Sequence, residues 1–562
     1  MRGTTLACLH VLFMVLLAHS LGTPGVALGQ QTINYASVGG RVTDATEAVM
    51  SGAQVAARET ETNLTTTTST DQEGRFRFPY LKPSQYEIRV TAAGFTETKR
   101  IITLTVGAAV ELPVSLNVEA VQTDVTVTGD QPVLETARTQ ISGSVLQTEV
   151  KNLPVNGRNF LDIALLVPGV SPTNTASNQL FAETSAVPGQ GLSINSQRNF
   201  SNSFIVDGLS ANDDAAGLSG IFYGYDVVSE FQVVTSGGQA EFGRALGGYM
   251  NVITKSGTNT THGDLYGYFR NQRFNAANAL AHTALPVTQA QYGVTLGGPI
   301  TRDRTFYFGN FEQRELNQSG LITIAPADIA AINSRLAAVG YQGALISTGI
   351  YPNPVHMTTL LGKVDHQFNP RDQFSIRYSL YDVHSKNSRG AGGLSAASAS
   401  SALDDTDQTI AVSNIATFSS RIVNETRGQF THSSLKALPS DSIGPAVSIS
   451  GVASFGTLSG SPTGRLNKLS EIVDNLSYQA GAHSIRAGAD FLYNSDTITF
   501  PSCCSAASAS ASYSRTDWSP PGPPPRWQTG PRLMFVSRSP PGSAPVLPWP
   551  RPRVRGRRRE SF

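Results

Sequence analysis

Polar and apolar residues alternate persistently from residue 260 to about residue 500. Tyr292, Val294 and Leu296 are apolar, whereas Gln291 and Thr295, which are out of phase with them, are polar. Successive side chains of a β-strand point to opposite faces of the sheet, so this pattern predicts strands with one apolar and one polar face. The candidate strands are 262–271, 290–298, 304–314, 358–368, 373–383, 408–418, 423–432, 471–479 and 484–495.

The connections between these candidate strands alternate in length. Short connections at 299–303, 369–372, 419–422 and 480–483 separate long ones. Short periplasmic turns and long external loops are typical of outer-membrane β-barrels, whose apolar side chains face lipid and whose polar side chains face the lumen. A soluble β-sandwich would explain the alternation but not this asymmetry of the loops. Beyond the N-terminal segment the sequence predicts no spanning helix, so a membrane barrel is expected.

Two regions before residue 260 also carry strand patterns. Residues 34–118 combine a turn at 71–74 with alternation at 86–90, which predicts a small β-sandwich. Residues 227–234 and 247–255 predict two strands joined by glycine-cornered turns. Glycine is favoured at such corners because it adopts backbone angles that strain other residues.

Residues 1–29 have the features of an export signal. Arg2 supplies a positive charge, residues 6–18 are apolar, and residues 27–29 are small enough for signal peptidase. The apolar run is shorter than the ~20 residues that a spanning helix needs. A cleaved signal peptide is therefore preferred to a membrane anchor, and export is expected.

Charge and cysteine content exclude several classes of function. The chain has 42 basic and 41 acidic residues, and ten of the basic but only two of the acidic ones follow position 500. The first 500 residues are therefore mildly acidic and offer no broad basic surface, so no nucleic-acid partner is expected. Three cysteines, two of them adjacent, cannot build a disulfide framework or a cysteine metal site.

The sequence lacks recognisable catalytic and metal-binding motifs. It contains no G-x-S-x-G, no H-E-x-x-H and no phosphate-binding glycine loop, so neither an enzyme nor a cofactor is predicted. Asp207, Asp213 and Asp214 lack the ligand spacing of a calcium loop and are interpreted as turn residues. No metal site is predicted.

Three stretches resemble the plug domain of TonB-dependent outer-membrane receptors. Residues 247–257, GGYMNVITKSG, are similar to the end of that plug, which precedes the first barrel strand. The second likeness lies at 152–160 followed by 165–170, and the third at 193–199 leading to 204–208. The resemblance implies that a periplasmic domain comes before the plug and a membrane barrel after it.

A fourth stretch resembles a different family. Residues 37–44, 52–55, 71–76 and 93–95 are similar to the carboxypeptidase regulatory-like domain, which has a transthyretin-like sandwich without catalytic residues. This likeness favours a structural or partner-docking role for the sandwich over carbohydrate binding, which would rest on fold analogy alone.

Together the resemblances imply an Oar-like receptor over about residues 34–500. The expected fold is mainly β, with an N-terminal transthyretin-like β-sandwich, an α+β plug domain at 130–258, and an incomplete antiparallel transmembrane β-barrel that begins with residues 259–500. Residues 196–198 read Ser-Gln-Arg where many siderophore receptors have Arg-Gly. Siderophore specificity is therefore not carried over.

The segment 121–129 occupies the place of the family's TonB box, which a partner protein captures by strand addition. A simple connector after the sandwich is an equally open interpretation. The candidate box residues are Thr123, Asp124, Val125, Thr126 and Val127.

Three plug arginines, Arg158, Arg198 and Arg244, are candidate contacts to the polar barrel lumen. The alternative is that they are solvated loop charges.

The expected function is that of a receptor in the bacterial outer membrane, with its sandwich and plug on the periplasmic side. External loops would bind a solute, such as an oligosaccharide or a peptide, and a TonB-type energy-transducing protein would drive its import through the barrel. Outer-membrane lipid would surround the strands. The alternatives are an outer-membrane adhesion or structural protein and a secreted carbohydrate-binding module.

Residues 501–562 differ from the rest of the chain. They contain 13 of its 31 prolines and ten arginines, and barrel strands do not carry such proline density. A frameshifted or misassembled end is expected here, and a genuine Pro-rich basic tail is the alternative. A plugged barrel needs about 22 strands, so the nine predicted ones are not expected to form a functional pore by themselves.

Overall fold

The structure of the chain is a computed structural model. It describes residues 34–118, 141–145, 149, 158, 160–172, 191–214, 218–220, 223–237, 241, 243–277, 284–480 and 483–499. All of these lie in the first of two compact units, which ends at Ala511. The predicted signal peptide, the segment 121–129 and the tail 501–562 lie outside the described residues, as does most of the 152–160 stretch.

Residues 36–116 form the predicted β-sandwich. One sheet contains β1 (Ala36–Asp44), β4 (Arg75–Leu81), β7 (Ala109–Glu111) and β8 (Val114–Leu116). The other contains β3 (Thr65–Ser69), β2 (Gln54–Glu59), β5 (Ser84–Thr91) and β6 (Thr98–Leu104). Alternate residues of β5, namely Tyr86, Ile88 and Val90, are buried in the core, which confirms the predicted alternation.

The plug is built around a mixed sheet of five strands. Its order is β13 (Leu209–Ser210), β12 (Asn202–Val206), β17 (Gly248–Thr254), β16 (Val228–Ser236) and β9 (Ile141–Val145). The antiparallel pair of β16 and β17 confirms the two strands predicted at 227–234 and 247–255. The parallel pairing of β12 with β17 was not predicted, because no local pattern identifies the partner of a strand.

Short elements surround this sheet. The helical ones are α3 (Phe160–Ile163), η1 (Ala164–Leu166), η2 (Asn199–Ser201) and η3 (Tyr225–Val227). The remaining strands form two small pairs, β10 (Val170–Pro172) with β11 (Leu192–Ile194) and β14 (Asn212–Asp213) with β15 (Leu218–Ser219).

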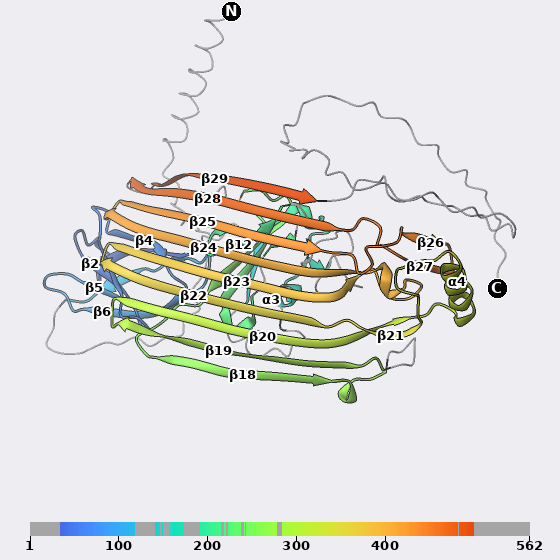
Figure 1. Ribbon diagram of the computed structural model, residues 1–562. Helices are drawn as coiled ribbons and strands as arrows, with labels where there is room; N and C mark the ends of the chain where they lie inside the picture. The colour runs from blue at the N-terminus through green and yellow to red at the C-terminus, as the bar shows by residue number, and fades with distance from the viewer. Residues whose placement is uncertain are drawn as a thin grey trace, which may run out of the picture. The chain divides into compact units, whose positions relative to one another are not determined.

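The barrel region is one antiparallel sheet of ten strands (Figure 1). Its order is β18 (His262–Asn271), β19 (Val287–Thr301), β20 (Thr305–Ile322), β22 (Val355–Asn369), β23 (Asp372–Arg389), β24 (Ser401–Ser419), β25 (Ile422–Ala437), β28 (Thr463–Ala480) and β29 (His483–Thr499), while β21 (Gly349–Pro352) pairs with β20. Within the described residues β18 and β29 each pair on one side only, so the sheet is not closed.

All nine predicted strands are present, and most are longer than predicted. The strand predicted at 471–479 begins at Thr463, for example. Its added part places Arg465 and Asn467 on the inner face and Lys468 on the outer face. Hydrogen-bonded pairing continues there although hydrophobic alternation has ended, and the sequence pattern detects only the alternation.

The two faces of the sheet differ as predicted. On β19, Tyr292 and Leu296 expose 48% and 49% of their surface, whereas Gln291 and Thr295 on the other face expose 1% and 4%. The outer face therefore carries the apolar side chains. The inner face carries the polar ones and is covered by the plug.

The connections confirm the predicted asymmetry. Short links of two or three residues join β19 to β20, β22 to β23, β24 to β25 and β28 to β29. The long loops contain η4 (Gln272–Phe274), α4 (Pro326–Ala338), η5 (Ala397–Ala399), β26 (Val447–Ile449) and β27 (Ala453–Phe455). Figure 1 shows α4, β26 and β27 together at one end of the strands, where an apolar cluster that includes Ile346, Tyr351 and Phe455 joins three of the loops.

None of the helices in the described part of the chain combines the length and the apolar character required to cross a membrane.

Candidate functional site

The plug meets the barrel wall at the tight turn after β12. Asp207 and Gly208 both have positive φ, at 47° and 78°, because the chain reverses there into β13. A side chain at Gly208 would also collide with atoms of Arg427 and Asn34. Glycine is therefore required both for the backbone conformation and for the close approach of the wall.

Asp207 joins plug and wall through one carboxylate. It accepts hydrogen bonds from the Thr254 backbone N–H at 2.9 Å and the Thr254 hydroxyl at 2.7 Å. From the wall, Arg377 of β23 donates to the same carboxylate, and Lys363 Nζ of β22 lies 3.9 Å from it. Burial alone would raise the pKa of Asp207, but the two cations and the hydrogen bonds hold it below its usual value.

A second group of contacts holds the next plug loop. Arg465 Nη1 of β28 lies 2.5 and 2.6 Å from the two carboxylate oxygens of Asp213. The backbone of Ser210 donates to Glu471 at 2.8 Å and accepts from Gln429 at 2.7 Å. The plug loop therefore meets the wall through charged and polar groups whose partners lie far apart in the sequence.

The three predicted plug arginines occupy different environments. Arg158 donates to Asp226 of the plug at 2.7 Å and to the Tyr268 hydroxyl of β18 at 2.8 Å, and its guanidinium lies 4.2 Å from the centre of the Tyr268 ring. Arg244 bonds Asp214 and Ser210, both within the plug. Arg198 is exposed just before η2. The candidate box residues Thr123 to Val127 lie outside the described residues.

The wall cations Lys363, Arg377 and Arg465 were not singled out from the sequence. Lys363 and Arg377 lie within predicted strands, at positions that the alternation assigns to the lumen face. The alternation could therefore have identified both as lumen-facing cations. Arg465 lies in the part of β28 that the pattern missed.

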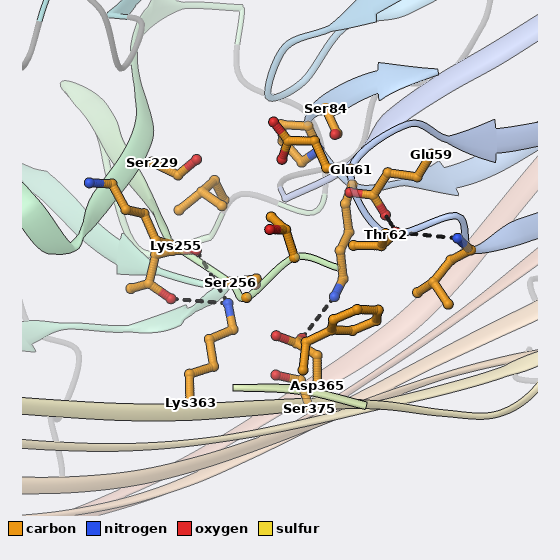
Figure 2. Close-up of a pocket in the computed structure, with 18 of the residues that line it drawn as sticks. Glu59, Glu61, Thr62, Ser84, Ser229, Lys255, Ser256, Lys363, Asp365 and Ser375 are labelled. Carbon is orange, nitrogen blue, oxygen red and sulfur yellow. Dashed lines mark hydrogen bonds and ion pairs between the residues drawn. The ribbon is translucent and has the colours of Figure 1, made fainter. Parts of the chain in front are cut away.

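A cavity of about 660 Å³ opens beside the Asp207 contact. Figure 2 shows Lys363 and Asp365 pointing into it from the wall, with Glu59 and Thr62 of the sandwich on the opposite side. Thr254 and Ser256, from the end of the plug, complete the lining. The cavity therefore lies where sandwich, plug and wall meet.

An ion pair crosses this cavity from sandwich to wall. Lys82 Nζ lies 2.8 Å from Asp365 Oδ1. Burial alone would lower the pKa of Lys82, but the carboxylates of Asp365 and Glu59 outweigh it and raise that pKa above its usual value. Burial raises the pKa of Glu59, which accepts a hydrogen bond from Thr62 at 2.7 Å.

Two further hydrogen bonds fix the sandwich to the plug and the wall. Tyr80 and Ser477 share one at 3.0 Å, and the Val106 backbone donates to Glu230 of the plug at 3.0 Å. The described residues contain no group of three or more His, Cys, Asp or Glu side chains that could hold a metal ion.

Two family models match the chain. An outer membrane beta barrel domain matches residues 253–359 and 348–519, and a carboxypeptidase regulatory-like domain matches residues 37–117. The antiparallel sheet and these matches indicate a location in the bacterial outer membrane. The chain is a homologue of the TonB-dependent transporter Oar of Myxococcus xanthus, with 29% identity over 262 residues. That match covers 44% of this chain and 23% of Oar, so the chain spans less than a quarter of that relative.

Solved structures of outer-membrane transporters and receptors are also similar. The transporter YddB of Escherichia coli has 13% identity and a TM-score of 0.45, with 64% of this chain and 54% of that chain covered. The ferric enterobactin receptor PfeA of Pseudomonas aeruginosa has 14% identity and a TM-score of 0.42, with 62% and 48% covered. The siderophore receptor PirA of Pseudomonas aeruginosa has 14% identity and a TM-score of 0.41, with 64% and 49% covered. These named relatives are transporters and receptors, not enzymes.

Proposed function

We propose that the chain acts as a TonB-dependent receptor once its barrel is closed, and that it then binds a solute, such as an oligosaccharide or a peptide, at its external loops and imports it past a movable plug. The observation that carries this proposal is the ionic contact between plug and wall. Asp207 and Asp213 are held by cations of the wall. When such an ion pair separates in a water-filled lumen, water can solvate both charged partners. A fully apolar interface would instead expose its apolar surface to water, at a cost in free energy.

The order of the plug strands suggests how force would reach this contact. The candidate box at 121–129 precedes β9, which is the edge strand of the plug sheet and pairs only with β16 among the described strands. β16 pairs in turn with β17, whose last residue, Thr254, bonds Asp207. Tension on the box would therefore act on the plug sheet from its edge, and Arg158 and Asp207 would resist it at the wall.

Capture of the box can be tested with a synthetic peptide of residues 119–131. Titration into the purified periplasmic domain of a TonB-type protein should show binding by calorimetry. Because strand addition uses backbone hydrogen bonds and proline lacks the donor, Val125→Pro and Val127→Pro should abolish binding. Val125→Thr keeps the donor and should change the affinity by less than about twofold. Equal binding by the proline peptides would rule out capture of this segment.

An outer-membrane adhesion protein is the main alternative. Such a protein would use the barrel as an anchor and would not need a plug that moves. Cell adhesion that depends on this chain and persists without any TonB-type protein would favour the anchor.

A further inference from the structure

The sandwich touches the barrel wall through an aromatic residue that also contacts a wall cation. Tyr80 of β4 shares a hydrogen bond with Ser477 of β28 at 3.0 Å, and its ring centre lies 5.2 Å from the guanidinium of Arg486 of β29. Arg486 Nε donates to the same Ser477 hydroxyl at 3.2 Å. A guanidinium within about 6 Å of an aromatic ring centre is attracted by the face of the ring. Tyr80 therefore holds Arg486 both through its ring and through Ser477.

Arg486 is at the same time a partner of the plug. Its Nη1 donates to Glu241 Oε2 at 3.0 Å, and the two side chains are 12% and 9% exposed. Arg427 of β25 lies 3.5 Å from the other carboxylate oxygen of Glu241. One wall cation is therefore shared by Tyr80 of the sandwich and Glu241 of the plug.

The sandwich also bonds the plug directly, at the strand next to the plug edge. The backbone N–H of Val106, in the turn between β6 and β7, donates to Glu230 at 3.0 Å, and the Val106 carbonyl accepts from Gln232 Nε2 at 3.2 Å. Glu230 and Gln232 both belong to β16, with which the edge strand β9 pairs. The sandwich and β9 are therefore attached to the same plug strand.

The docking of the sandwich on the wall combines attraction with repulsion. Two aromatic residues of the sandwich and two aliphatic residues of the wall form a buried apolar cluster, which consists of Tyr35, Tyr80, Ile415 and Val423. Arg77 of β4, however, is close enough to Arg486 for the two like charges to repel each other. This contact should therefore cost less to open than its attractive parts alone would suggest.

We propose that the sandwich is a clamp on the plug, in which Tyr80 positions Arg486 for Glu241 and Val106 holds β16, and that this clamp opens before the plug moves. The candidate box at 121–129 follows the sandwich and precedes β9 in the chain, so tension on it acts on both. The core residues of the sandwich all lie between positions 36 and 116, so the sandwich can leave the wall without opening its own core. This inference rests on the proposed function and names a regulation of its plug contact.

The clamp can be tested by hydrogen exchange on the full chain purified from outer membranes. Because the Val106 N–H donates to Glu230, its exchange reports opening of the contact between sandwich and plug, whereas the amides of β17 report opening of the plug sheet. The Val106 amide should exchange first. Exchange of β17 before Val106 would overturn the proposed order of opening.

Variants of Tyr80 test its role in positioning Arg486. Tyr80→Leu should raise the exchange rates of the β17 amides about fivefold, and Tyr80→Phe, which keeps the ring over Arg486, should raise them less. Unchanged exchange in β2, the strand between β3 and β5, verifies that the sandwich stays folded. Unchanged exchange of β17 in Tyr80→Leu would overturn the clamp, and an equal rise in Tyr80→Phe would contradict the role of the ring.

A double-mutant cycle shows whether Tyr80 acts through Arg486. Glu241→Gln weakens the plug partner of Arg486, so Tyr80→Leu should add less than about twofold in that background. Asp213→Asn is the matched control, because it weakens a plug contact that uses Arg465 instead. There Tyr80→Leu should keep its effect of about fivefold. Equal effects in both backgrounds would show that the sandwich does not act on the plug through Arg486.

The peptide experiment with the TonB-type protein involves neither Tyr80 nor Glu241. A box that binds its partner in a chain without this coupling would contradict the clamp alone and leave the receptor function standing. A box that fails to bind in a chain with the coupling would instead contradict the receptor function.

Discussion

The sandwich and the plug obtain their hydrophobic cores in different ways. The sandwich core consists entirely of residues between Ala36 and Leu116. The plug core contains Phe231 and Met250 of its own sheet, but also Phe308 of β20 and Leu361 of β22. The sandwich therefore encloses its own apolar surface, whereas the plug completes its core with side chains of the wall. A domain of the first kind keeps its core covered when it moves, whereas one of the second kind exposes apolar surface when it leaves the wall, so movement of the plug requires an input of energy.

The polar contacts follow the same division. The sandwich pairs with the wall through Lys82, which is 28% exposed, and Asp365, which is 6% exposed. The plug pairs with the wall at several places, through Asp207 with Arg377, Asp213 with Arg465 and Glu241 with Arg486. Because each buried pair is costly to break, the plug should be the more firmly held of the two.

The largest expected effect separates the two domains directly. Residues 34–118 alone should unfold cooperatively in urea, with a free energy of unfolding of about 5 kcal/mol. Ile88→Ala, at a fully buried position, should lower it by about 2–5 kcal/mol. Residues 130–258 alone should show no cooperative transition, because Phe308 and Leu361 are missing from their core. A sharp unfolding transition of the isolated plug in urea would show that the plug, like the sandwich, has a self-contained core.

A smaller effect is expected from the plug contact in the full chain. Asp207→Asn leaves Lys363 and Arg377 without their carboxylate and should destabilise the plug contact by about 3–5 kcal/mol. The measurement is the rate at which protease cleaves the plug in outer membranes. Asp214→Asn removes the more exposed pair with Arg244 and should cost at most about 1 kcal/mol. Equal cleavage rates for the two variants would contradict the strength assigned to the Asp207 contact.

The pH dependence of that contact has a defined sign. The pKa of Asp207 is lower in the folded protein than in the unfolded chain. The stabilisation that Asp207 gives to the plug contact is therefore complete above its unfolded-state pKa of about 4. It is lost as the pH falls through the folded-state pKa. Cleavage of the plug should accelerate in acid in the wild type, and this acceleration should be weaker in Asp207→Asn.

The smallest effect is expected at the sandwich. Lys82→Met should weaken the contact of the sandwich with the wall by about 1–3 kcal/mol, because the buried Asp365 loses this partner while Lys363 remains near it. Hydrogen exchange of the backbone amides of residues 80–82 and 84–86, which flank the turn from β4 to β5, should quicken, whereas Lys99→Met on β6 should leave it unchanged. The pKa of Lys82 is raised in the folded protein. The contact should therefore persist below about pH 10.4 and be lost as the pH rises through the folded value. Slower or unchanged exchange in Lys82→Met would show that other bonds hold the sandwich.

The strands and the direction of their side chains could be predicted from the sequence alone. Gln291 faces the lumen and Tyr292 faces outward because a strand alternates its side chains whatever its partner is. The short links, the β16–β17 hairpin and the sandwich followed from equally local patterns. The strand ends were missed where, as at Lys468, the outer face ceases to be apolar.

The pairing of charges between plug and wall could not be predicted from the sequence and is visible only in the folded chain. Asp207, Asp213 and Asp214 were interpreted as turn residues, yet Asp207 bonds Arg377 from 170 positions away and Asp213 bonds Arg465 from 252 positions away. A local pattern reports only neighbours along the chain. Such pairs depend instead on the register of every intervening strand and on the height at which the plug lies against the wall. A register shift of one residue would turn each lumen-facing cation to the outer face.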